Sequence, residues 1–111
     1  MVTFAARHVV IVRFPFSDLT ASKLRPAIVL AKAGRGDWLL CQITSKSYGD
    51  PRAVGLLTAD FASGSLQLSS YARPAKLFTA HATLIVSVAG ELRVEKFQAI
   101  QEEIVRLVRQ I

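Results

Sequence analysis

The stretch Ser22–Ala31, SKLRPAIVLA, places two cationic side chains directly before a proline and an apolar run. A residue that precedes proline is pushed out of the helical region into extended backbone. Proline itself is tolerated at the first position of a strand, where no ladder donor is needed. The run Ala27–Ala31 is apolar on both sides, which predicts a central strand with both faces covered. We therefore expect Arg25 at a fixed junction between a loop and a buried strand.

The flanking sequence predicts further strands on both sides of this one. His8–Phe14 alternates loosely, and residues 15–25 are rich in Ser, Thr and Asp, which indicates a loop. A turn at residues 33–37 leads to a strand at Trp38–Thr44, with Gln42 and Thr44 on the face opposite its apolar side chains. Shorter apolar segments follow at Val54–Thr58, Leu66–Tyr71 and Leu84–Val88. Short strands with turns between them are typical of an all-β barrel.

The last part of the chain has a different period. From Val94 onward the apolar residues recur at steps of three and four, as on one face of an amphipathic helix. These residues are Phe97, Ile100, Ile104, Leu107, Val108 and Ile111. The sequence thus predicts a single domain over residues 1–111, a mostly β barrel that a C-terminal amphipathic helix caps.

Composition limits the class of protein. A net charge of +6 and a pI near 10.1 favour an anionic partner such as nucleic acid, although basic charge also serves solubility alone. The start of the chain lacks a signal-peptide layout and no apolar run is long enough for a membrane helix, so we expect a cytoplasmic protein. Cys41 is the one cysteine, and it does not combine with His8 and His81 into metal-ligand spacing. We expect neither a metal nor a cofactor.

Arg25 has two interpretations from local physics. A guanidinium held at a strand end suits phosphate, because its planar fork makes two parallel hydrogen bonds. A salt bridge to Asp18 or Asp50 would explain the same residue without any function. The residues around Arg25 leave both interpretations open.

The chain resembles the PemK/MazF family of toxin endoribonucleases. The resemblance is carried by VVIVRFPFSDLTASKLRPAIVLA (residues 9–31), WLLCQITSK (38–46), LSSYARPAKLFT (68–79), LIVSVAGELR (84–93) and the terminal helix. It implies an SH3-like barrel of the PemK/CcdB type that forms a homodimer, cuts single-stranded RNA without metal and pairs with a small antitoxin. Lys46 stands where several relatives have a neutral residue, and Arg7-His8 replaces the usual Gly-Asp before the first strand.

The resemblance also implies roles for particular residues. Arg25 and Thr44 would carry catalysis, in which the 2′-hydroxyl of RNA attacks the adjacent phosphate and leaves 2′,3′-cyclic phosphate and 5′-hydroxyl ends. The substrate-binding residues would be Phe16, Ser17, Asp18, Lys23, Ser45, Lys46 and Arg73. The proton acceptor stays open, because guanidinium is a poor base and neither histidine lies in a matching motif. Two alternatives are a CcdB-like toxin that binds gyrase and a non-catalytic SH3-like RNA-binding module.

Overall fold

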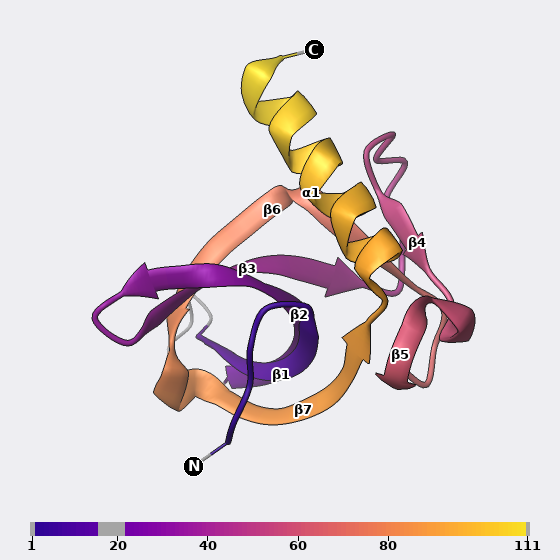
Figure 1. Cartoon of the computed structure of the whole chain (residues 1–111). Coiled ribbons are helices and arrows are strands. Elements are labelled where there is room, and N and C mark those ends of the chain that lie inside the picture. Colours follow the sequence, from indigo (N-terminus) through magenta and orange to yellow (C-terminus); the bar gives the residue numbers. More distant parts are fainter. Residues whose placement is uncertain (1, 16–21, 111) are drawn as a thin grey trace.

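In the part of the chain that the computed structural model describes, residues 2–15 and 22–110, seven strands form one curled sheet (Figure 1). The strands are β1 (His8–Pro15), β2 (Ser22–Gly34), β3 (Asp37–Thr44), β4 (Val54–Leu56), β5 (Phe61–Gly64), β6 (Ser70–His81) and β7 (Ile85–Leu92). Their order in the sheet is β4-β6-β3-β2-β1-β7-β5, and every neighbouring pair is antiparallel. Helix α1 (Val94–Arg109) follows the last strand. The predicted mostly β fold with a C-terminal helix is confirmed.

The apolar run after Pro26 lies in the middle of this sheet, as predicted. Strand β2 pairs with β1 on one side and β3 on the other, and Ala27, Ile28 and Val29 are completely buried. Ile28 packs into one apolar cluster, whereas its neighbours Ala27 and Val29 pack into a second. Both faces of the strand are covered over Ala27–Val29, whereas Ala31 at the end of the predicted covered run is exposed.

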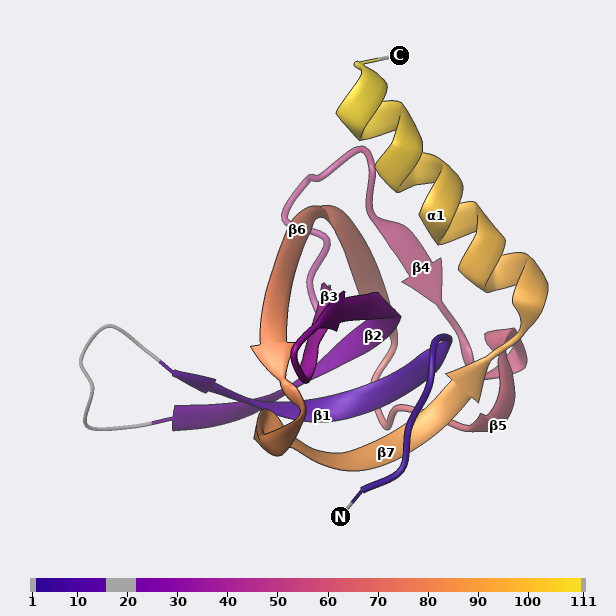
Figure 2. The same ribbon diagram turned by 60° about the vertical axis from the view of Figure 1, so that its left-hand side comes forward.

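The expected loop over residues 15–25 is wrong at its two ends. Pro15 ends β1, and Ser22–Arg25 belong to β2, where Lys23 pairs with Phe14 and Arg25 with Val12. Figure 2 shows the two paired strand ends projecting from the body of the protein. Cross-strand pairing provides backbone hydrogen bonds that polar composition does not reveal. Arg25 therefore lies inside a strand, and not at a junction between a loop and a strand.

The predicted strand at Leu66–Tyr71 is also misplaced. Residues 61–64 form β5 instead, and β6 begins only at Ser70 and continues to His81. β6 contains a large bulge, because Ile43 pairs with Ala72 and Cys41 with Leu77, which leaves residues 73–76 opposite a single residue of β3. Pro74 lies in this bulge, where the ladder does not require its missing N–H.

Helix α1 begins at Val94, as predicted, and closes the core. Phe97 and Ile100 are buried in the same cluster as Ile28 of β2 and Leu92 of β7. Figure 1 shows the helix crossing the sheet beside β4 and β6, with its C-terminal turns extending past the strands. No helix among the described residues is both long and apolar enough to cross a bilayer.

Candidate phosphate-binding cavity

A cavity of about 500 Å³ opens where the β2–β3 ladder ends. This volume lies within the roughly 300–1,000 Å³ of typical ligand sites. Four strands provide its apolar floor, through Ile11 of β1, Pro26 of β2, Ile43 of β3 and Ala89 of β7. The rim consists of the residues before Pro26, the segment after β3 and the β5–β6 connection.

Arg25 and Thr44 meet at this cavity. The β2–β3 ladder has Ala27 opposite Gln42 as its last pair, and Arg25 and Thr44 each lie two residues beyond that pair on their own strand. Both residues line the cavity and both are partly buried. The Thr44 hydroxyl oxygen accepts the N–H of Lys46 at 3.3 Å, which orients the hydroxyl and leaves its proton to donate.

The cavity is basic. Arg25 and Lys46 line it together with Thr44 and Ser45, and no carboxylate belongs to the described lining. Lys23 is exposed and lies two residues before Arg25 on β2, outside that lining. An apolar floor with cations and hydroxyls at its rim suits a ligand that carries phosphate on an apolar or aromatic body.

Arg73 is not part of the cavity lining but lies next to it. Its Nε donates to the Asp50 carboxylate at 3.2 Å, and its guanidinium lies 5.3 Å from the centre of the Tyr48 ring. The Arg73 carbonyl accepts the Cys41 thiol proton at 3.3 Å, and burial raises the pKa of that thiol to about 12. One of the two acidic partners considered for Arg25, Asp50, is thus engaged by Arg73.

Sequence reasoning missed Tyr48, which also lines the cavity and is 67% exposed. A lone aromatic residue inside the polar segment Ser45–Arg52 was the available signal, because binding residues are disproportionately found on loops. The remaining predicted residues, Phe16, Ser17 and Asp18, lie outside the described part of the chain.

The two histidines have structural contacts away from the cavity. His8 Nδ1 accepts the N–H of Ala5 at 2.8 Å, and His81 Nδ1 accepts the N–H of Thr83 at 3.2 Å at the start of a short 3₁₀ turn. Within residues 2–15 and 22–110, no three His, Cys, Asp or Glu side chains gather as a metal site would require.

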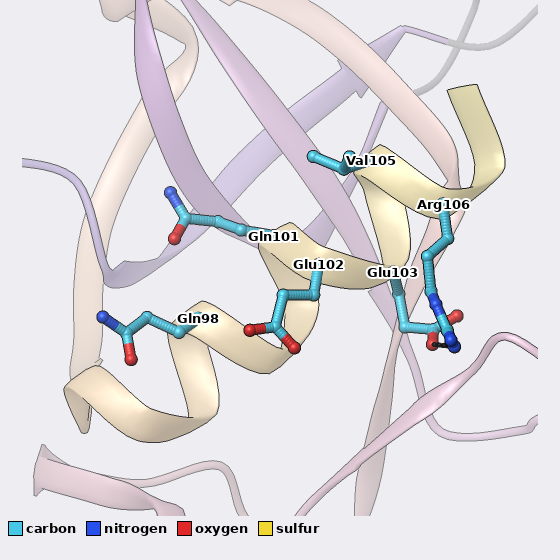
Figure 3. A pocket seen from close by; sticks show the side chains of 6 residues that line it. All are labelled: Gln98, Gln101, Glu102, Glu103, Val105 and Arg106. Carbon is cyan, nitrogen blue, oxygen red and sulfur yellow. Dashed lines mark ion pairs between the residues drawn. The ribbon is translucent and has the colours of Figure 1, made fainter. Parts of the chain in front are cut away.

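A second depression lies over the exposed side of α1 (Figure 3). All six of its lining residues belong to that helix, and Gln98, Gln101 and Glu102 extend from it without converging on a common point. Glu103 makes ion pairs with Arg106 at 3.8 Å and with Arg52 at 3.6 Å. The surface is a solvated helix face whose carboxylates would repel a polyanion.

The fold and the cavity together describe this chain as a small β protein with a basic cavity at the end of its central strand pair. No protein-family profile and no curated protein matches the sequence. Solved structures do match the fold. The MazE–MazF complex from Deinococcus radiodurans contains a similar chain with a TM-score of 0.75 at 20% identity, and the match covers 94% of each chain.

Two mycobacterial structures agree with this result. An endoribonuclease in complex with its cognate antitoxin has a TM-score of 0.76 at 12% identity, with 98% of both chains covered. The Mycobacterium tuberculosis toxin MazF-mt6 has a TM-score of 0.72 at 19% identity, over 93% of this chain and 97% of that one. The chain therefore has the fold of the MazF toxins, which includes the predicted barrel and terminal helix.

Proposed function

We propose that this protein is the toxin of a type II toxin–antitoxin pair and a metal-independent endoribonuclease for single-stranded RNA. The observation that carries the proposal is the meeting of Arg25 and Thr44 at one basic cavity, within a fold shared with MazF toxins. RNA provides its own nucleophile in the 2′-hydroxyl, so the protein has to orient that group and stabilise charge.

The reaction forms a bond between the 2′-oxygen and phosphorus and breaks the bond from phosphorus to the 5′-oxygen. The 2′-hydroxyl loses its proton, and the departing 5′-oxygen gains one. Arg25 stabilises the additional negative charge on the phosphate, because its fork donates two hydrogen bonds. The Thr44 hydroxyl donates a hydrogen bond to the phosphate and fixes the position of that phosphate. Ser45, Lys46 and Lys23 bind the adjoining part of the RNA chain. The products are a 2′,3′-cyclic phosphate and a 5′-hydroxyl end.

The proposed partners follow from the same surface. A cognate antitoxin would cover the basic cavity with an acidic segment that folds on binding, and a two-fold homodimer would join two cavities into one groove. The antitoxin-bound structures from Deinococcus radiodurans and mycobacteria support a protein partner for this fold. The proposed location is the cytoplasm, where both mRNA and the antitoxin are available.

Cleavage of single-stranded RNA in the presence of a chelator tests the activity. We expect Arg25→Ala and Thr44→Ala to lower the rate by at least about 10²-fold, the usual effect of losing one preorganised donor to a transition-state oxyanion. Arg25→Lys should also fail, because an ammonium group does not reproduce the fork. Arg109→Ala is the matched control, since it removes the same charge from the exposed end of α1.

The chemical ends of the RNA products, and whether the protein binds RNA, distinguish the endoribonuclease from the two alternatives. Fragments with free 5′-hydroxyl ends accept label from polynucleotide kinase without prior dephosphorylation. RNA that binds but stays intact would instead identify a non-catalytic RNA-binding module. A protein that neither binds nor cuts RNA but arrests gyrase would identify the CcdB-like alternative.

A further inference from the structure

Tyr48 combines exposure with a backbone conformation that bulky residues disfavour. Tyr48 has φ 55° and the following Gly49 has φ 66°, while the N–H of Asp50 donates to the Ser47 carbonyl at 3.0 Å. These features describe a tight turn of type I′, whose two central positions normally hold Asn, Asp or Gly. A tyrosine kept in the left-handed region at a cavity rim suggests that its position has a function.

The Tyr48 ring is held from one side. The Arg73 guanidinium lies 5.3 Å from the ring centre, and Arg73 is itself fixed by its ion pair with Asp50. The second oxygen of Asp50 accepts the N–H of Arg52 at 2.9 Å. The Arg73 and Asp50 side chains are only 18% and 10% exposed, whereas Tyr48 is 67% exposed. A partly buried ion pair therefore supports an aromatic ring that remains open to solvent.

The location of the ring favours a nucleic-acid base as its ligand. Tyr48 lines the same cavity as Arg25, Thr44 and Lys46, so an aromatic surface and phosphate-binding cations lie side by side. Bases of single-stranded RNA stack on such rings, and the neighbouring cations bind the backbone that links them. A purely apolar peptide would gain nothing from these cations, and an acidic peptide would gain little from a flat, fixed ring.

We propose that Tyr48 is the stacking platform for one unpaired base of the bound RNA, next to the phosphate at Arg25, and that Arg73 and Asp50 are positioning residues for its ring. This inference rests on the proposed function. It assigns Arg73 an indirect role in substrate binding, through Tyr48, in place of direct contact with phosphate.

The binding test uses single strands that the proposed reaction cannot cut. The probes are 2′-fluoro oligonucleotides, which lack the 2′-hydroxyl, and an abasic strand of the same length, which keeps the phosphates but has no bases. Wild-type protein should bind the base-bearing strands more tightly. Tyr48→Ala should lose roughly 5- to 140-fold in affinity for them, as expected for one stacked base, and should bind the abasic strand unchanged.

Three variants control this comparison. Tyr48→Phe keeps the ring and should retain the preference for bases. Val108→Ala truncates a side chain of similar exposure, 73%, on the far end of α1, and should change neither affinity. Arg73→Gln should weaken binding of the base-bearing strands only, whereas direct contact with phosphate would reduce the log–log salt slope by about 0.7 on every strand.

The outcomes distinguish this inference from the proposed function. Equal affinity of wild type and Tyr48→Ala for base-bearing strands would overturn the stacking role while leaving RNA cleavage by Arg25 intact. A uniform loss on the abasic strand as well would assign Tyr48 to backbone binding and also overturn it. Failure of the wild-type protein to bind any strand would overturn the proposed function together with the inference.

Discussion

Replacing Cys41 with alanine tests whether burial in the core beneath the candidate site keeps the Cys41 thiol protonated. Cys41 is completely buried in β3, and its thiol donates to the carbonyl of Arg73, the residue that supports the Tyr48 ring. Burial raises the pKa of the thiol from 9.0 to about 12. In the unfolded chain the thiol regains its ordinary pKa, so the two states bind its proton differently above pH 9.

The sign and size of the change in the free energy of unfolding follow from this difference in proton binding. Below pH 9 both states hold the proton, and Cys41 contributes no pH dependence. Between pH 9 and 12 the unfolded state releases the proton and the folded state keeps it, so the free energy of unfolding falls by about 1.4 kcal/mol per pH unit. At about pH 10.5 the loss relative to pH 7 amounts to about 2 kcal/mol.

Urea unfolding of wild type and Cys41→Ala at both pH values, followed by far-ultraviolet circular dichroism, isolates this contribution. Other groups that titrate in alkali are common to both proteins and cancel in the difference. At pH 7 the variant should be less stable by about 1 kcal/mol, because a small cavity replaces the sulfur. By about pH 10.5 the order should reverse. A stability difference that stays constant with pH would refute the argument that Cys41 is kept neutral by burial.

Three further predictions concern charge, backbone and assembly. Lys46→Gln and Lys23→Gln should each reduce the log–log salt slope of single-stranded RNA binding by about 0.7 on all sequences, and an unchanged slope would make them solvated surface charges. Gly64→Ala should cost about 2–4 kcal/mol in urea unfolding, because φ is +66° and the new Cβ would lie 2.1 Å from the Ala89 carbonyl oxygen. Gly49→Ala has the same φ with open space around it, so it should cost only about 1–2 kcal/mol; equal losses would exclude the clash. Sedimentation should show a dimer, and an antitoxin peptide should compete with RNA; a monomer that cleaves RNA, or a ternary complex, would contradict the shared groove.

The sequence by itself determined the parts of this protein that depend on local pattern. The run Ala27–Ala31 has no polar side, which predicted a covered central strand; it lies at the centre of the sheet, and it is buried over Ala27–Val29 but exposed at Ala31. The apolar residues after Val94 repeat with the helical period, which located the start of α1 correctly. The turn predicted over residues 33–37 is also present, and it is shorter than predicted: only Arg35 and Gly36, both with positive φ, lie between β2 and β3.

The strand bounds and side-chain contacts that depend on pairing between distant segments are known only from the tertiary structure. β6 is long and bulged because it pairs with β3, 27 to 44 positions earlier in the chain. Its Ala, Lys and Pro residues are of types that are depleted in strands. The same pairing brings Arg73 to Asp50 and Tyr48, a contact that no spacing in the sequence indicates. Arg25 was identified from its motif, but its place inside β2 follows from the pairing of that strand with β1, where Arg25 lies opposite Val12. The chemistry of the side chains identifies the candidate site residues, whereas pairing between distant strands determines which of these residues lie close together.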